Sequence, residues 1–239
     1  MKKHFTILHE DEAIVVIDKK AHVLSIPDRF DPTLPNLKEV LSRRRDEVFV
    51  VHRLDKETSG VIVFAKTAEA HAALSDQWQQ GIVEKKYLAL TLRPQEAAGH
   101  IDEGITESSH QKGSYIVSED GKASQTSYQT LESWDRYALL ELNLHTGRTH
   151  QIRVHMKYIG APLLVDEKYG LSDAFYLSSI KKMKTPRGQK ENPLLSRSAL
   201  HAFQIKFNHP LSGDPVTYEA PLHKDMKAVM YQLKKKYDV

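Results

Sequence analysis

Three short segments of this chain are apolar at every position, without the alternation that marks a half-exposed strand. They span residues 13–17, 61–65 and 138–140. Runs of this kind are typical of strands that are covered on both faces. A central sheet, buried on both sides, is therefore the feature around which the rest of the fold has to be arranged.

Helical spacing of apolar residues occurs in three other segments. The first covers residues 70–78, with Thr67 placed to cap the helix and Gly81 to follow its end. The second is expected over residues 149–159 and the third over residues 226–233. Because strands and helices mix without strict β-α-β alternation, the pattern favours an α+β fold over a doubly wound α/β fold. The chain has no repeat and no long linker, so we expect residues 1–239 to form a single domain.

The length of 239 residues allows a substantial core, and the chain contains no cysteine. Disulfides, thiolate metal ligands and a cysteine nucleophile are therefore excluded, and the composition suits a reducing compartment. The first residues lack the apolar segment of a signal peptide, and no apolar run approaches the roughly 20 residues that a membrane span needs. We expect a cytoplasmic protein that does not enter a membrane.

The net charge is only +3, from 34 Lys and Arg against 31 Asp and Glu, but the basic residues are clustered. The clusters lie at residues 43–45, 181–197 and 224–236. One such cluster is often only a solvated face, whereas three together favour a polyanionic partner. The second cluster contains a Pro- and Gly-rich stretch, residues 185–193, which we interpret as a surface loop that is either an RNA contact or a plain connection.

The densest group of chemically active side chains occupies residues 50–60, just before an apolar strand. This turn combines His52, Arg53, Asp55 and Glu57 with a Thr-Ser pair. Asp55 either caps the turn through backbone amides or is held ionised by a nearby guanidinium, as a nucleophile or an electrostatic stabiliser needs.

Other chemistries fit the sequence poorly. His145, His150 and His155 are spaced by five residues, which places successive rings about 140° apart on a helix, whereas paired metal ligands favour a spacing of four. No G-x-S-x-G elbow, Walker loop or G-x-G-x-x-G loop occurs in the sequence. We therefore predict neither a metal site nor a nucleotide cofactor.

Three segments carry a resemblance to a known family. Residues 52–60, 86–89 and 146–155 resemble, in the same order, the signature segments of the RluA family of RNA pseudouridine synthases. The similarity extends from about Ile7 to Pro221. It covers nearly the whole chain, and the match of three long segments in the family's order is very unlikely to arise by chance.

Two departures from the family pattern concern the subfamily and its RNA target rather than the reaction. Residues 19–22 read Lys-Lys-Ala-His where relatives often have Lys-Pro-Ala-Gly. Residues 165–170 read Val-Asp-Glu-Lys-Tyr-Gly where Gly-Asp commonly precedes Lys-Tyr-Gly. Many relatives also carry an amino-terminal S4 domain, but Asp55 comes too early here for one to fit before it.

The resemblance implies an α+β pseudouridine synthase fold, in which a central mixed and mainly antiparallel sheet is flanked by helices and carries an active-site cleft. It implies that the protein isomerises uridines in structured RNA, in a stem-loop of ribosomal or transfer RNA, without a cofactor or metal. No obligate protein partner is evident, and we expect a monomer.

Five residues receive roles by matching the family motifs. Asp55 corresponds to the essential catalytic aspartate. Tyr87 corresponds to the tyrosine that stacks on the flipped-out uracil and is thought to assist proton removal at C5. Arg53 corresponds to the arginine that fills the gap left by the extruded nucleotide. Arg153 corresponds to the arginine that pairs with the catalytic carboxylate, and Ile152 is expected to pack against the base.

Two other classes of function remain open from the residues themselves. One is an inactive RNA-binding module of the same fold, which is opposed by the presence of Asp55, Tyr87 and Arg153 together. The other is a nucleoside or glycoside hydrolase. Hydrolases of this kind ordinarily need two carboxylates, and only Glu57 is near Asp55 in the sequence.

The remaining polar residues of the motifs have less specific roles. His52, Thr58 and Gly60 are interpreted as loop architecture. Arg148 and His150 either contact phosphate or close the turn into the predicted helix.

Overall fold

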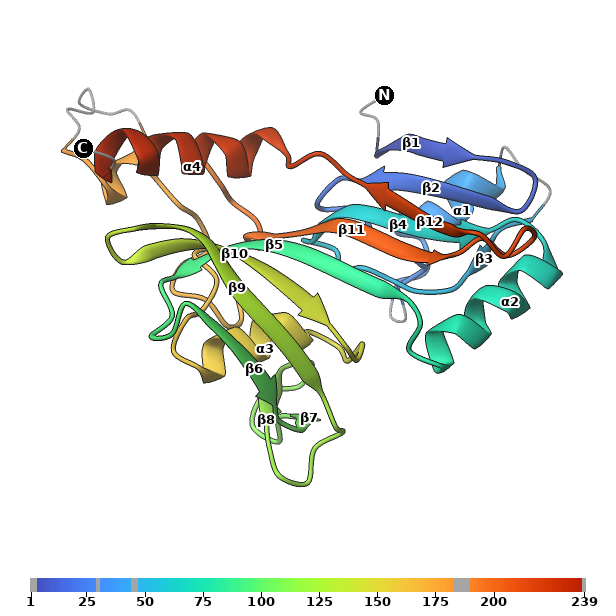
Figure 1. The fold of residues 1–239 in the computed structure, drawn as a ribbon. Helices are drawn as coiled ribbons and strands as arrows, with labels where there is room; N and C mark the ends of the chain where they lie inside the picture. Colours follow the sequence, from blue (N-terminus) through green and yellow to red (C-terminus); the bar gives the residue numbers. More distant parts are fainter. Residues whose placement is uncertain (1–3, 29–30, 44–46, 183–189, 238–239) are drawn as a thin grey trace. The chain divides into compact units, whose positions relative to one another are not determined.

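A computed structural model describes residues 4–28, 31–43, 47–182 and 190–237 (Figure 1). Two compact units make up the fold: residues 1–87 with 201–221, and residues 88–200 with 222–239. Parts of two basic clusters lie outside the described residues. These parts are Arg44, Arg45, Lys184, Arg187 and most of the Pro- and Gly-rich stretch.

The first unit is built on a mixed sheet. Strands β1 (Phe5–Glu10), β2 (Ile14–Lys19), β4 (Ser59–Ala65) and β11 (Leu200–Asn208) hydrogen-bond in that order. Strand β3 (Phe49–Val50) pairs with β4, and β12 (Pro215–Glu219) pairs with β11. The pairing of β11 with β4 is parallel, whereas the other pairings in this unit are antiparallel.

The core of the first unit confirms the predicted doubly covered strands. Every residue of β2 and β4 is buried. Helix α2 (Ala68–Gln79) packs against β4 and begins at Thr67, whose hydroxyl accepts the Ala70 N–H as predicted. The short helix α1 (Leu37–Ser42) is capped in the same way by Asn36.

The second unit has its own antiparallel strands. Strand β5 (Glu84–Leu92) enters this unit from Leu88 on, and the order β5, β10 (Tyr137–Leu144), β9 (Gln125–Trp134), β6 (Ala98–Asp102) follows. Strands β7 (Ile105–Glu107) and β8 (Tyr115–Val117) form a separate hairpin. The predicted strand at residues 138–140 is confirmed as the buried first half of β10.

In the described part of the second unit, three segments are helical. They are α3 (Gln151–Tyr158), a short 3-10 turn (Leu177–Ser179) and the terminal helix α4 (Lys224–Tyr237). Helix α3 begins two residues later than expected, because His150 has the left-handed backbone angle φ of 58° that no helix can include. Gly160, with φ of 73°, follows its end as predicted.

The strands and the few helices of the two units confirm the α+β class and the mainly antiparallel sheet. Within the ranges that the structure describes, no helix is both long and apolar enough to cross a membrane.

Candidate active site

Asp55 lies in the loop that joins β3 to β4 in the first unit. In this loop Arg53 is exposed, Leu54 is 6% exposed and Asp55 is partly exposed. The Asp55 carbonyl accepts the Thr58 N–H at 3.1 Å and so closes a turn. The buried Leu54 therefore anchors the loop between the exposed Arg53 and the partly exposed Asp55.

Two buried polar side chains fix the backbone on either side of Asp55. The Ser25 hydroxyl donates to the Leu54 carbonyl at 2.9 Å and accepts the Leu54 N–H at 3.1 Å. The Lys19 side chain is completely buried, and its ammonium donates to the carbonyls of Val23 at 2.8 Å and Lys56 at 3.1 Å. A buried ammonium needs several such acceptors, so the Lys56 backbone is held in place.

His52 is part of this architecture, as the sequence analysis expected. Its Nε2 accepts the Val63 N–H at 3.1 Å, and its ring stacks on Trp78 with the ring centroids 4.9 Å apart. Burial, together with the nearby Lys85 charge, lowers the pKa of His52 to about 3. The ring is therefore neutral near pH 7, which leaves Nε2 able to accept that hydrogen bond.

The start of β4 is equally constrained. The Ser59 hydroxyl lies 2.8 Å from Nδ1 of the buried His201, whose Nε2 lies 3.0 Å from the Ala220 carbonyl. Gly60 has φ of 114°, and a Cβ at this position would overlap the Ala202 backbone. Only glycine fits here, which gives a physical reason for the glycine in the motif.

The departure from the family pattern at residues 19–22 has a structural consequence. His22 adopts the left-handed φ of 65°, which a glycine at this position would adopt without strain. Its Nδ1 lies 2.8 Å from a carboxylate oxygen of Glu57, two residues after Asp55. The histidine thus adds a contact to the Asp55 loop, which the sequence alone did not indicate.

Tyr87 is brought close to Asp55 within the first unit. It lies on β5 and is 8% exposed. Burial, and then the negative charge of Asp55, raise the pKa of the Tyr87 phenol above its usual value. The phenol is therefore protonated near neutral pH.

Arg153 and Ile152 lie on α3 in the second unit, and both are buried. The Arg153 guanidinium donates two hydrogen bonds to the Asp166 carboxylate, from Nε to Oδ2 at 2.6 Å and from Nη2 to Oδ1 at 2.8 Å. The ring of Tyr169 lies against the same guanidinium, 4.9 Å from Cζ to the ring centroid.

The sequence analysis did not single out Asp166, the carboxylate that pairs with Arg153. Its carboxylate is fully buried, and Oδ1 also accepts the N–H groups of Lys168 and Tyr169. Burial opposes ionisation, but the hydrogen bonds and the charge of Arg153 outweigh it and lower the pKa of Asp166. Asp166 belongs to the Asp-x-Lys-Tyr-Gly stretch, which the sequence comparison treats only as a departure from the family pattern.

The polar residues before α3 close the turn. The Gln151 side-chain oxygen accepts the Arg148 N–H at 3.0 Å and the Thr146 hydroxyl at 2.8 Å. The Arg148 side chain donates to the Ala123 carbonyl at 3.1 Å, and His150 Nδ1 lies 2.8 Å from the Tyr169 hydroxyl. These contacts are those expected if Arg148 and His150 close the turn into the helix.

The three histidines considered as metal ligands have protein partners instead. His145 contacts the Ser127 hydroxyl and His150 contacts Tyr169. His155 is held between the Thr126 hydroxyl and the Glu103 carbonyl. In the described part of the chain, no three His, Asp or Glu side chains are grouped so as to hold a metal ion.

The candidate site residues thus fall into two groups. Asp55, Arg53 and Tyr87 belong to the first unit, where Asp55 and Tyr87 are close enough to interact electrostatically. Ile152 and Arg153 belong to the second unit, where Arg153 is paired with Asp166. The pairing of Arg153 with Asp55 stays a prediction.

Comparisons with known proteins identify the family of this chain. Residues 13–158 match the family model described as RNA pseudouridylate synthase. The ribosomal large subunit pseudouridine synthase D of Xanthomonas campestris pv. campestris is 34% identical over 238 residues, which cover 95% of this chain and 69% of that protein. An uncharacterized RNA pseudouridine synthase of Chlorobaculum parvum is 36% identical over 245 residues, which cover 96% of this chain and 74% of that protein.

A solved structure is also similar. Human RNA pseudouridylate synthase domain containing 4 matches with a TM-score of 0.70 and 27% identity, over 95% of this chain and 92% of the human chain.

Proposed function

Because the chain belongs to the RNA pseudouridylate synthase family, we propose that Asp55 is the carboxylate with which it isomerises uridine in RNA to pseudouridine. The observation that carries this assignment is the placement of Asp55, on a loop fixed by Ser25 and Lys19, beside the buried Tyr87. A fixed backbone keeps the carboxylate in position relative to the reacting atom. Such positioning lowers the activation barrier of the reaction.

The isomerisation breaks the bond between N1 of uracil and C1′ of ribose and forms a bond between C5 and C1′. C5 loses a proton and N1 gains one, so the atoms and electrons balance within the substrate. An ionised carboxylate stabilises the positive charge that develops at C1′ when N1 leaves, or bonds to that carbon for the lifetime of the intermediate. Asp55 supplies this carboxylate in the proposal.

Tyr87 is assigned the stacking role on the flipped base. Its ring is buried beside Asp55, and a buried aromatic face suits a base that has left its helix. The raised pKa of its phenol disfavours a phenolate that would take the C5 proton in the resting enzyme. Arg153 would orient the carboxylate, Ile152 would pack against the base, and Arg53, which is exposed, would fill the space that the nucleotide leaves.

The RNA target is proposed from the relatives. The Xanthomonas protein is named for the ribosomal large subunit, and we propose a uridine in that RNA as the substrate here. We place this activity in a cytoplasmic monomer, and the absence of cysteine suits a reducing compartment. Mapping pseudouridines in RNA from cells that lack the gene would identify the position, and re-expression of the wild-type protein should restore it.

The test of Asp55 uses RNA that is tritiated at C5 of uridine. Isomerisation releases the label from C5 and leaves the RNA intact. Asp55→Asn should lower this release by more than about a thousandfold, as the loss of a reacting group does. The matched control is Asp120→Asn at an exposed turn, which should keep wild-type activity.

The other outcomes decide against the proposal. Turnover by Asp55→Asn near the wild-type rate would overturn the assignment of that residue. RNA binding by the wild type without tritium release would indicate an inactive binding module, and release of free uracil would indicate a hydrolase. RNA affinity and melting temperature are measured in parallel, because Asp55→Asn should leave both nearly unchanged.

A further inference from the structure

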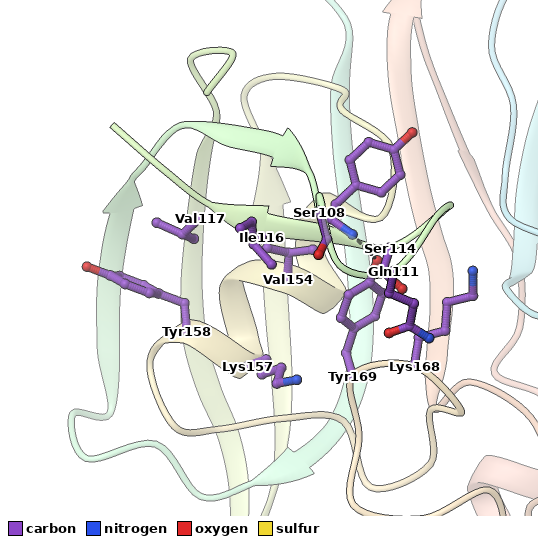
Figure 2. Close-up of a pocket in the computed structure, with 11 residues that line it drawn as sticks. Ser108, Gln111, Ser114, Ile116, Val117, Val154, Lys157, Tyr158, Lys168 and Tyr169 are labelled. Atoms are coloured by element: carbon purple, nitrogen blue, oxygen red, sulfur yellow. Dashed lines mark hydrogen bonds between the residues drawn. The ribbon is translucent and has the colours of Figure 1, made fainter. Parts of the chain in front are cut away.

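A pocket of about 350 Å³ lies in the second unit between the β7–β8 hairpin and helix α3 (Figure 2). Its walls come from the hairpin and its connecting turn, from the last turns of α3, and from the turn at residues 168–169. None of the five predicted site residues lines it. The volume is within the range of sites that hold small ligands.

The lining of this pocket is divided in character. Ile116 and Tyr158 give it apolar surface. These two large side chains are 46% and 54% exposed, although large apolar side chains are usually buried. Figure 2 shows Gln111 and Lys168 on the opposite side in that view. Lys157 also lines the pocket, and no acidic side chain does. Apolar surface beside cationic groups matches the two parts of a nucleotide, its base and its phosphate.

An independent observation comes from Ser114, which also lines the pocket. Ser114 is 5% exposed, and its hydroxyl has no hydrogen-bond partner in the described structure. Buried polar groups are nearly always paired in folded proteins, so an unpaired hydroxyl in a pocket wall is available to a ligand.

The walls are fixed before any ligand is present. The Tyr169 hydroxyl accepts the Tyr115 N–H at 2.9 Å, and Lys168 donates to the Gly113 carbonyl at 2.8 Å. The Gly113 N–H donates to Glu107 at 2.8 Å, which closes the connection between β7 and β8. A pocket with preformed walls loses little conformational entropy when it binds a ligand.

The pocket also lies close to Arg153. Tyr169 lines the pocket, and the same ring lies against the Arg153 guanidinium, 4.9 Å from Cζ. Its hydroxyl contacts His150, at the start of the helix that carries Arg153. A ligand in the pocket is thus separated from Arg153 by one aromatic ring, which favours the substrate RNA itself as the source of that ligand.

We propose that this pocket binds one nucleotide of the substrate RNA other than the uridine that is isomerised. Its base lies against Tyr158 and Ile116, and its phosphate lies near Lys157 and Lys168. This inference rests on the proposed function, since it takes the ligand from the same RNA. The pocket then contributes to the choice of RNA that is positioned for reaction, whereas Asp55 takes part in the isomerisation itself.

The first test replaces Lys157, whose ammonium has no hydrogen-bond partner within the part of the chain that the structure describes. Lys157→Ala should raise the dissociation constant for substrate RNA about three- to tenfold at moderate salt and lower the slope of log K against log salt by about 1. The matched control is Lys38→Ala, an exposed lysine on α1 outside the basic clusters, which should change neither. An unchanged affinity and slope for Lys157→Ala would refute the phosphate contact.

The second test addresses the base. Tyr158→Ala should weaken RNA binding about tenfold, as the loss of one stacking ring does, whereas Tyr158→Phe keeps the ring and should bind nearly as well as the wild type. Leu211→Ala in the β11–β12 turn is the control, because Leu211 is similarly exposed at 55% and lies outside the basic clusters. Equal losses in the Ala and Phe variants would indicate that the hydroxyl bond to Glu103, and not stacking, matters, and would overturn the base assignment.

A third variant separates binding from a structural role. Ser114→Ala removes a hydroxyl that has no partner in the free protein, so the melting temperature should stay the same or rise while RNA affinity falls. A lower melting temperature with unchanged affinity would contradict the proposal.

RNA affinity and the single-turnover rate distinguish the pocket proposal from the proposed function. The predicted losses are in dissociation constant and KM, and the single-turnover rate at saturation reports on the Asp55 site. If RNA is isomerised normally and the pocket variants bind it normally, the pocket proposal fails and the proposed function stands. If the wild-type protein isomerises no RNA, the proposed function fails first.

Discussion

At the scale of single residues, Arg153 shows what a motif can and cannot predict. The family pattern predicts that it pairs with the catalytic carboxylate of Asp55, whereas the partner that the structure gives it is the buried carboxylate of Asp166. That partner is 13 residues along the chain, and its position depends on the turn before Lys168 and Tyr169. Sequence spacing within one helix gives no information about such a contact, so Asp166 was not predicted.

The contact of Arg153 with Asp166 and its predicted pairing with Asp55 can be tested separately. Arg153→Ala removes a countercharge from Asp166 and, if the predicted pairing exists, from Asp55 as well. The rate should fall, and the acid limb of the pH–rate profile should move to higher pH, because a carboxylate that loses a nearby cation is protonated more easily. Arg153→Lys keeps the charge but not the planar fork and should rescue only part of the rate.

Asp166→Asn is the matched variant for that experiment. It keeps the Arg153 charge but removes the buried countercharge, so stability should fall by about 3–5 kcal/mol while the pH–rate profile keeps its position. A profile for Arg153→Ala that overlays the wild type would show that Arg153 does not pair with Asp55. Thermal unfolding and single-turnover rates over a series of pH values provide both readouts.

At the scale of elements, prediction succeeded where the signal was local. The α2 helix and its Thr67 cap follow from residues within one turn of each other. The start of α3 does not, because Gln151 bonds to Arg148, Thr146 and the distant Thr126, and this network sets the left-handed turn at His150. Likewise, no pattern in the chain links Ser25 to Leu54, although this contact fixes the loop of Asp55.

Ser25→Ala tests how far this loop depends on its anchor. The variant leaves the Leu54 N–H and carbonyl without their buried partner, so stability should fall by about 1–3 kcal/mol. If the loop positions Asp55, kcat should fall about 10- to 100-fold with little change in RNA affinity.

Ser124→Ala is the control for Ser25→Ala. It also removes a buried serine that donates to a backbone carbonyl, that of Lys122, but it lies in the second unit. A loss of kcat no larger in Ser25→Ala than in Ser124→Ala would mean that the rate change reflects general destabilisation and not positioning.

At the scale of the whole molecule, the fold could be predicted because runs of consecutive apolar residues recur along the chain. Strands with long apolar runs, such as β2 and β4, are typical of the centre of a sheet, and the family motifs lie beside them. The pocket between the β7–β8 hairpin and α3 could not be predicted, because its lining combines short segments that have no pattern of their own. Long-range contacts of polar side chains were the main part of the structure that the sequence did not indicate.

One such polar group, Asp11, connects two turns of the first unit and affects acid stability. One carboxylate oxygen accepts the N–H groups of Ala13 and Ile14, both at 2.8 Å. The other lies 2.7 Å from Nε2 of His9 and 3.0 Å from Nε2 of His209, near the β11–β12 turn. Burial opposes ionisation, but these hydrogen bonds outweigh it and lower the pKa of Asp11 to about 2.

The sign of the resulting pH dependence follows from that shift. Because the folded-state pKa of Asp11 lies below its ordinary value, its contribution to stability is complete above about pH 4 and is lost as the pH falls towards 2. The side chain is 29% exposed, so we discount the contribution for solvent and expect about 1–2 kcal/mol. Asp11→Asn should therefore be less stable than the wild type at about pH 5, and this difference should shrink at about pH 2.5.

Urea unfolding at the two pH values measures the difference directly. Asp214→Asn, at an exposed position near the β11–β12 turn, removes a carboxylate without these bonds and should show little difference at either pH. A deficit of Asp11→Asn that is the same at both pH values would mean that the carboxylate's hydrogen bonds do not depend on its charge. The link between the two turns would then contribute packing and geometry, and the acid sensitivity of the protein would have to come from other carboxylates, such as the buried Asp166.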